Sequence, residues 1–212
     1  MIIKVCGMRE VANINQLQEL DIDFMGVIRY AKSKRFVDNE QAQKVSELTM
    51  NKGTVGVYVN ATFEQILQDI IPLQLDIIQL HGDEDSAFAK ALLELNLKIF
   101  KAIQITANFD FTVLKEWEPL AKEYPGKIFF LFDTATPQYG GSGTKFNWQL
   151  LDSYNGSIPF LLSGGIGTED AVAVKAIKHD LFMGIDLNSK FEIEPGLKNI
   201  EDLKTFIEKI RK

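Results

Sequence analysis

Two residues capable of acid-base chemistry, Cys6 and Asp133, each end a short apolar run of the kind that forms a buried strand. Ile2, Lys4 and Cys6 alternate along the first run, so strand geometry places their side chains on one face. A buried lysine needs a carboxylate partner, and Asp186 in the last apolar run is the candidate. A positive charge beside Cys6 favours the thiolate, so we expect Cys6 to serve as a base or a nucleophile.

Asp133 follows five consecutive apolar residues, 128–132. An apolar strand favours the neutral form of a carboxyl group, which suits a general acid. A potential acid and a potential base therefore end two different strands. The alternative for each is a structural role, because a lone cysteine is often a small buried hydrophobe and an aspartate here could cap a helix or form an ion pair.

Two later segments could bind an anion through backbone amides. Gly164 and Gly165 follow the seventh apolar run, and Asn188 and Ser189 follow the eighth. Glycine lets a backbone come close to phosphate oxygens, and amide groups at such loop ends point at the anion. We expect these four residues to hold a phosphate group.

Arg35 and His81 are further candidates for contacts with a ligand. Arg35 lies in the basic segment 31–36, where it could grip a carboxylate with two parallel hydrogen bonds or be one of several solvated charges. His81 ends the fourth apolar run, and either a hydrogen bond to a substrate or a structural role is open. His179 is the only other histidine and there is no Cys/His cluster, so we expect no metal site.

Eight apolar runs at nearly even spacing would position these residues. They span residues 2–7, 24–29, 54–60, 76–82, 98–103, 128–133, 160–165 and 182–187. Stretches with helical periodicity separate them, among them 13–20 and 62–70, the second with Thr62 as N-cap, and one at 200–210 ends the chain. This order predicts one (β/α)8 barrel domain over residues 1–212, in which the carboxyl ends of the strands carry the active site.

Composition narrows the class of partner. The net charge of −6 and the pI near 5.1 argue against nucleic acid and against an anionic membrane surface. No apolar run is long enough to span a bilayer, the chain starts directly with a strand, and its single cysteine fits a reducing compartment, so we expect a cytoplasmic protein. A small phosphorylated molecule is the expected partner, and the surface composition is compatible with a monomer or a homodimer.

The motifs together resemble the phosphoribosylanthranilate isomerase family of tryptophan biosynthesis. The resemblance runs from Ile3 to the last helix and is carried by Lys-Val-Cys-Gly-Met at 4–8, Ser-Lys-Arg at 33–35, Gln-Leu-His-Gly at 79–82, Tyr-Gly-Gly-Ser-Gly-Thr at 139–144, Leu-Ser-Gly-Gly at 162–165, and Gly-Ile-Asp at 184–186 followed by Glu192 and Pro195-Gly196. It implies an Amadori rearrangement of N-(5-phosphoribosyl)anthranilate to 1-(2-carboxyphenylamino)-1-deoxyribulose 5-phosphate. It also implies that neither a metal nor an organic cofactor takes part.

The resemblance implies a role for each candidate residue. Asp133 would be the general acid that protonates the furanose ring oxygen, and Cys6 the general base that removes the proton from C2. Arg35 would hold the anthranilate carboxylate. The remaining expected substrate-binding residues are His81, Gly164, Gly165, Asp186, Asn188 and Ser189, of which the amides around Gly164, Gly165, Asn188 and Ser189 would hold the phosphate.

The chain departs from the family pattern at three places. Lys190 stands where the family commonly has glycine, so it either adds charge to the phosphate site or points to solvent. Asn147 replaces the aspartate of a Phe-Asp-Trp motif, which we interpret as an exchange of one N-cap for another. Met8 and Arg9 replace the usual Ile-Thr, and nothing in the sequence explains that change.

Other phosphosugar barrels are the alternative function. An indole-glycerol-phosphate synthase would carry an additional N-terminal segment and a catalytic lysine, and a pentose epimerase would carry a metal-binding His/Asp set, and neither feature is present. A non-catalytic phosphate-binding barrel would be expected to lack Cys6 or Asp133, and both are present.

Overall fold

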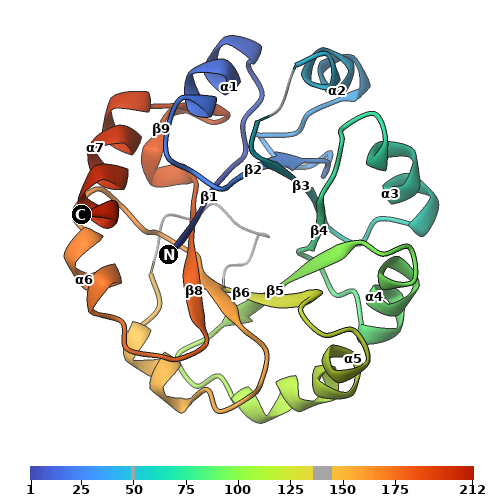
Figure 1. Cartoon of the computed structure of the whole chain (residues 1–212), viewed down its shortest axis with the longest axis vertical. Helices are drawn as coiled ribbons and strands as arrows, with labels where there is room; N and C mark the ends of the chain where they lie inside the picture. The colour runs from blue at the N-terminus through green and yellow to red at the C-terminus, as the bar shows by residue number, and fades with distance from the viewer. Residues whose placement is uncertain (49–50, 136–144) are drawn as a thin grey trace.

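The computed structural model describes residues 1–48, 51–135 and 145–212. Eight parallel strands pair in chain order and β1 pairs with β8, which closes the barrel (Figure 1). The strands are β1 (Ile2–Cys6), β2 (Phe24–Ile28), β3 (Gly53–Tyr58), β4 (Ile77–Leu80), β5 (Lys98–Ile105), β6 (Ile128–Thr134), β7 (Phe160–Leu162) and β8 (Phe182–Leu187). Each overlaps one predicted apolar run, and the predicted (β/α)8 barrel is confirmed.

Helices surround the barrel (Figure 1). They are α1 (Val11–Gln18), α2 (Asn39–Ser46), α3 (Phe63–Ile70), α4 (Ser86–Leu93), α5 (Glu118–Glu123), α6 (Ala171–Ala176) and α7 (Ile200–Arg211), with 3-10 helices η1 (Phe111–Trp117), η2 (Trp148–Ser153) and η3 (Ser189–Phe191). Thr62 caps α3 as predicted, its hydroxyl accepting from the Gln65 amide. None of the helices in the described part of the chain combines the length and apolar character of a membrane span.

Two local predictions fall after β6. Asn147 is the N-cap of η2, because its side chain accepts a hydrogen bond from the Gln149 amide, so the expected exchange of one cap for another is confirmed. The Tyr-Gly-Gly-Ser-Gly-Thr motif at 139–144 lies outside the described residues.

A short hairpin follows β8 and covers the site from one side. It consists of β9 (Glu192–Glu194) and β10 (Leu197–Lys198), which pair antiparallel. Asn13 of α1 clamps it, since its side chain accepts from the Lys198 amide at 2.8 Å and donates to the Lys198 carbonyl at 3.0 Å. Both residues are buried, so these two hydrogen bonds fix the hairpin against the helix layer.

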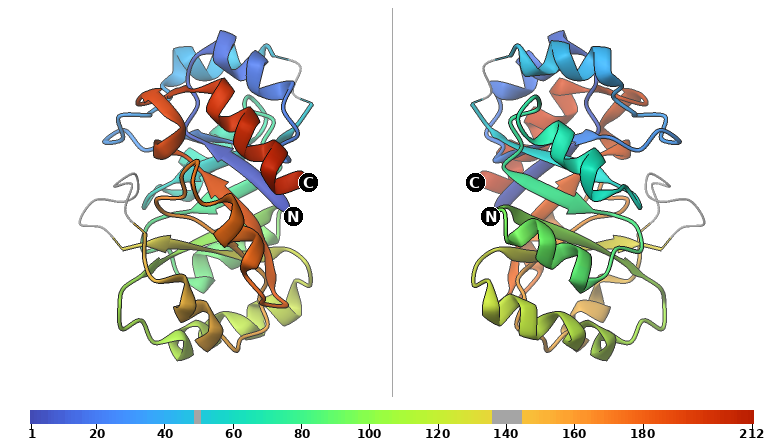
Figure 2. Two further views of the ribbon diagram at one scale, coloured as in Figure 1. Left: turned by 90° about the vertical axis from the view of Figure 1, so that its left-hand side faces the viewer. Right: turned by 90° about the vertical axis from the view of Figure 1, so that its right-hand side faces the viewer.

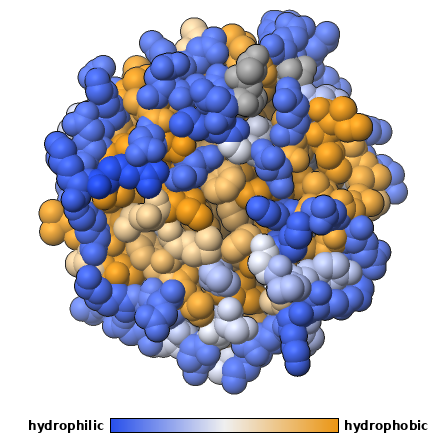
Figure 3. Space-filling model, in the orientation of Figure 1, coloured by the Kyte–Doolittle hydropathy of each residue, from blue (hydrophilic) through white to orange (hydrophobic). Residues whose placement is uncertain are grey.

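The barrel interior is filled by side chains. Phe24, Phe100 and Phe129 meet edge to face, with ring centroids 5.9 and 5.7 Å apart. Figure 2 shows both termini at one end of the barrel, and Figure 3 shows pale and apolar residues over the middle of the face seen in Figure 1, within a largely hydrophilic rim. This aromatic packing fills the barrel toward the amino ends of the strands, whereas the candidate residues Cys6 and Asp133 lie toward the carboxyl ends.

Candidate active site

A buried ion pair joins the first and last strands beneath the site. Lys4 Nζ lies 2.9 Å from Asp186 Oδ1, and the lysine side chain is fully buried. The two residues are paired in the register of β1 and β8, so the predicted partnership is confirmed. Burial alone would lower the pKa of Lys4, but the charges and hydrogen bonds of Asp186 and Cys6 together outweigh it and raise that pKa, so Lys4 keeps its charge.

Cys6 ends β1 on the same interior face, directly above Lys4. A methyl group placed on Gly26 of β2 would lie 2.7 Å from Cys6 Sγ and 3.2 Å from Lys4 Nζ, so the absence of a side chain at Gly26 makes room for both groups. Burial raises the pKa of the Cys6 thiol, and the nearby Lys4 offsets this only in part. Lys4 acts on the thiol in the predicted direction, toward the thiolate, but desolvation is the larger effect, so the pKa of Cys6 lies above its usual value.

Asp133 ends β6 across the barrel mouth and is buried. Its Oδ1 accepts a hydrogen bond of 2.8 Å from the Thr134 amide. Gly164 has φ +87° and packs so closely that an added methyl group would lie 2.7 Å from that same Oδ1. The absence of a side chain at Gly164 therefore makes room for the carboxyl group of Asp133. The sequence predicted phosphate binding for Gly164 but did not predict this role.

His81 approaches Asp133 from β4. Its Nε2 lies 3.4 Å from Asp133 Oδ2, which is long for a hydrogen bond, and this enclosed nitrogen has no closer partner. The amide nitrogen of Gln79 lies 2.8 Å from His81 Nδ1. An amide nitrogen can only donate, so Nδ1 accepts and the neutral ring carries its proton on Nε2, facing Asp133.

The two candidate catalytic groups share one mouth. Asp133 and His81 lie close enough to Asp186 for their charges to affect its pKa. Asp186 in turn accepts a hydrogen bond from Lys4, which lies beneath Cys6. The interior of the barrel thus holds a cation and a thiol on one side and a carboxyl with a histidine on the other. Such an arrangement can take a proton from one atom of a bound molecule and give a proton to another.

Arg35 is held by a carboxylate of the protein. Its Nε lies 2.9 and 3.0 Å from the two oxygens of Glu192, and its Nη2 lies 2.6 Å from Glu192 Oε2. Within the described residues its Nη1 donates no hydrogen bond. The side chain is only 13% exposed, so the alternative of a solvated basic loop is wrong for Arg35.

Glu192 and Lys198 are site residues that sequence reasoning missed. Lys198 Nζ is fully buried and lies 2.7 Å from both Glu192 Oε1 and Asn188 Oδ1. Burial would raise the pKa of Glu192, but hydrogen bonds from Arg35 and the charge of Lys198 hold it below its usual range. The only signal in the sequence was Glu192 within a family motif, since nothing marks a lysine in a surface hairpin as buried.

The expected phosphate-binding segments follow two neighbouring strands, β7 and β8. Gly164 and Gly165 both have positive φ, +87° and +67°, and within the described residues their backbone N–H groups donate no hydrogen bond. Asn188 and Ser189 lie at the start of η3. These loops therefore offer unoccupied amides at the strand ends where barrels often bind phosphate.

Lys190 follows Ser189 and is exposed, and its charge is one of the smaller effects that lower the pKa of Glu169. The described residues contain no group of three His, Cys, Asp or Glu side chains placed to hold a metal ion.

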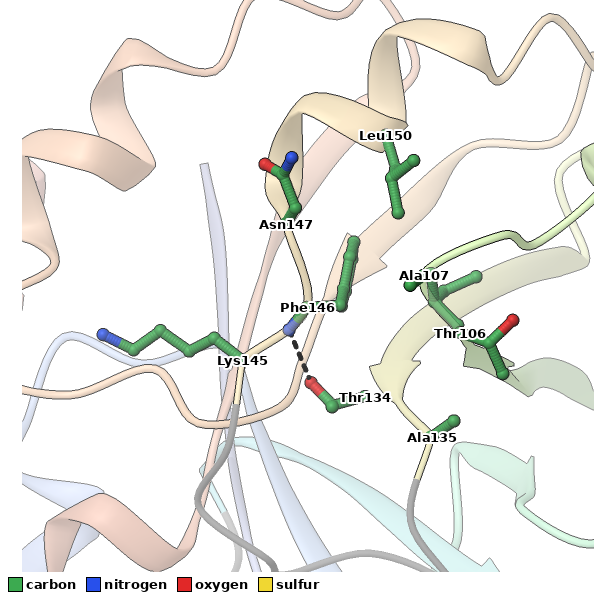
Figure 4. Close-up of a pocket in the computed structure, with 9 residues that line it drawn as sticks. Thr106, Ala107, Thr134, Ala135, Lys145, Phe146, Asn147 and Leu150 are labelled. Carbon is green, nitrogen blue, oxygen red and sulfur yellow. Dashed lines mark hydrogen bonds between the residues drawn. The ribbon is translucent and has the colours of Figure 1, made fainter.

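A separate hollow of 530 Å³ lies beside the ends of β5 and β6 (Figure 4). Three of its polar side chains, those of Thr134, Lys145 and Asn147, have protein partners. Thr134 Oγ1 accepts from the Phe146 amide at 3.1 Å, and Lys145 Nζ pairs with Asp170 at 2.6 Å. Asn147 caps η2. This hollow is lined by outward-facing residues such as Ile105 and is distinct from the mouth that holds Cys6 and Asp133.

A closed (β/α)8 barrel with a buried thiol and a buried carboxyl group at the carboxyl ends of its strands has the architecture of the barrel enzymes. Comparison with known proteins gives the family. A model of the family described as N-(5'phosphoribosyl)anthranilate (PRA) isomerase matches residues 3–209, and the chain belongs to this family.

Individual relatives agree over nearly the full length of the chain. The N-(5'-phosphoribosyl)anthranilate isomerase of Parabacteroides distasonis is 46% identical over 215 residues, which cover 99% of this chain and 93% of that protein. The crystal structure of phosphoribosyl anthranilate isomerase from Thermotoga maritima superposes with a TM-score of 0.81 at 31% identity, covering 100% of this chain and 99% of that one.

A further structure, of a phosphoribosyl anthranilate isomerase in complex with reduced 1-(o-carboxyphenylamino)-1-deoxyribulose 5-phosphate, superposes with a TM-score of 0.76 at 26% identity. It covers 100% of this chain and 99% of that one.

Proposed function

We propose that this protein is an N-(5'-phosphoribosyl)anthranilate isomerase, which converts its substrate to 1-(2-carboxyphenylamino)-1-deoxyribulose 5-phosphate by an Amadori rearrangement. The observation that carries the proposal is the pair Cys6 and Asp133. They end β1 and β6, and the ion pair of Lys4 and Asp186 connects their surroundings. The family membership of the chain supports the same reaction.

The reaction needs one proton donor and one proton acceptor. In the first step Asp133 protonates the furanose ring oxygen, the C1–O bond breaks and a protonated Schiff base forms. His81 Nε2–H faces the carboxylate that Asp133 becomes, and so stabilises it. In the second step Cys6, as the thiolate, removes the proton from C2. The resulting enolamine tautomerises to the ketone, so the rearrangement involves no external oxidant or reductant.

Two ends of the substrate carry negative charge, and the site offers separate groups for them. The open amides at Gly164 and Gly165 suit the phosphate, with Asn188 and Ser189 beside them. Arg35 suits the anthranilate carboxylate, because its Nη1 stays available while Glu192 accepts hydrogen bonds from Nε and Nη2. The cationic and anionic sides of the mouth would then orient the substrate between Cys6 and Asp133.

A growth test addresses the activity in the cell. The chain is expressed in a host that lacks this isomerase, and we expect growth without tryptophan. Absence of growth despite well-expressed, folded protein would contradict the proposal.

Purified variants address the two catalytic roles. Cys6→Ser and Asp133→Asn should each lower turnover by at least about a hundredfold, the low end for general acid-base catalysis. Their melting temperatures separate lost chemistry from lost folding. A variant that keeps near-normal turnover would remove that residue from the mechanism.

A further inference from the structure

Gln104 of β5 carries an amide group that the protein itself leaves unpaired. Both Oε1 and Nε2 are enclosed, and neither forms a hydrogen bond within the described residues. Unpaired buried polar atoms are rare in folded proteins, because burial strips them of water without a replacement partner. Such a group needs an explanation beyond the stability of the free protein.

The register of the barrel places this amide beside the candidate acid. Gln104 is the partner of Asp133 in the pairing of β5 with β6, and paired residues of parallel strands project to the same face. Phe100, two pleats earlier on β5, lies in the interior cluster with Cys6. Gln104 therefore points into the mouth. It does not support Asp133 directly, since the carboxylate oxygens face the Thr134 amide and His81.

The surroundings of Gln104 indicate the kind of group that it would bind. The neighbour of Gln104 on β6 is the carboxyl group of Asp133. The cations Lys4, Arg35 and Lys198 are each paired with a carboxylate on β8 or in the hairpin after it, so this side of the mouth suits a neutral group better than an anion. A carboxamide both donates and accepts hydrogen bonds, as a hydroxyl group does. A neutral hydroxyl matches both atoms of the amide, whereas a phosphate or a carboxylate would match only the nitrogen.

We propose that Gln104 is a substrate-binding residue whose amide hydrogen-bonds a hydroxyl of the sugar-derived part of the substrate, next to the oxygen that Asp133 protonates. This assignment rests on the proposed isomerase function. Gln104 thereby fixes the sugar relative to the acid, and its unpaired state in the free protein reflects a partner that arrives with the substrate.

The test replaces Gln104 by leucine, which keeps the approximate volume and removes both polar atoms. Binding of reduced 1-(o-carboxyphenylamino)-1-deoxyribulose 5-phosphate is measured by calorimetry, and thermal unfolding is measured without ligand. We expect affinity to fall about tenfold or more, as for one lost hydrogen bond to a buried amide, while the melting temperature stays equal or rises. Gln68→Leu, the same change on the exposed face of α3, is the matched control and should leave the affinity for the ligand unchanged.

A second probe identifies the group on the ligand. An analogue that lacks the contacted sugar hydroxyl should bind the wild type and Gln104→Leu equally, because the interaction is then missing from both. If leucine prevents folding, Gln104→Met offers an unbranched apolar chain for the same comparison. Equal affinity of the wild type and a folded variant for the complete ligand would overturn the role of Gln104 alone. A wild type that fails to bind this ligand at all would instead overturn the isomerase proposal, and the Gln104 assignment with it.

Discussion

Gly26 carries no functional group, yet its lack of a side chain makes room for Cys6 and Lys4. In Gly26→Ala the new methyl group would start 2.7 Å from Cys6 Sγ and 3.2 Å from Lys4 Nζ. Ordinary contact needs roughly 3.5–4.0 Å, so the thiol has to move by about 1 Å. A displacement of about 1 Å at a reacting group can cost about a hundredfold in rate. Overpacking of the interior should also cost about 1–3 kcal/mol of stability.

The assay is steady-state turnover of N-(5'-phosphoribosyl)anthranilate together with thermal unfolding. We expect kcat to fall about a hundredfold and KM to change little, because the charged and amide groups that bind the substrate lie on other elements. Gly126→Ala is the matched control. A methyl group there meets open space, but φ of +72° strains the backbone in the turn before β6, so stability falls without contact to Cys6. Near-normal kcat in a folded Gly26→Ala variant would refute the assignment of Cys6 as a closely positioned base.

Three further predictions concern the charges of the site. Because burial raises the pKa of Cys6, the single cysteine of the chain, its thiolate is a minor species at neutral pH, and the ultraviolet absorbance of a thiolate should appear only in alkaline solution and be missing from Cys6→Ser; a thiolate signal already present at about pH 6 would contradict this. Glu192→Gln leaves Lys198 without a buried counter-charge, so the melting temperature should fall by several degrees and KM should rise more than kcat falls, as Arg35 loses its support. Lys190→Ala should leave KM unchanged at low and high salt, because Lys190 is exposed; a loss of affinity that shrinks as salt rises would show that its ammonium binds the phosphate.

The barrel and the placement of Cys6 and Asp133 at the ends of its strands were predictable because they depend on patterns within single strands. Alternation along 2–7 put Lys4 and Cys6 on one face, and an aspartate after five apolar residues marked Asp133. The closure of eight strands into a barrel then made Asp186 the neighbour of Lys4. Each of these steps follows from spacing and from the geometry of one fold.

Some residues of the site were not identified from the sequence, because their importance depends on how neighbouring strands and loops align. Gly26 and Gln104 matter because they stand opposite Cys6 and Asp133 in the neighbouring strands, and alternation within a strand does not fix that register. Glu192 reaches Arg35 across 157 positions of sequence by way of a hairpin that folds back over the mouth. The raised pKa of Cys6 was missed for a related reason, since the sequence shows a neighbouring charge but not the depth of burial.

The ion pair of Lys4 and Asp186 also has a consequence for how the chain folds. It joins residues 182 positions apart, across the seam where the last strand meets the first. Such a distant contact forms only after the entropy of closing a very long loop has been overcome, and until then Lys4 lacks its counter-charge. A chain with its other strand pairs in place still lacks the electrostatic setting of Cys6. Catalytic competence therefore arises with the closing of the seam, and we expect recovery of activity during refolding to lag behind the burial of Trp117, which packs far from that seam against Phe130 of β6.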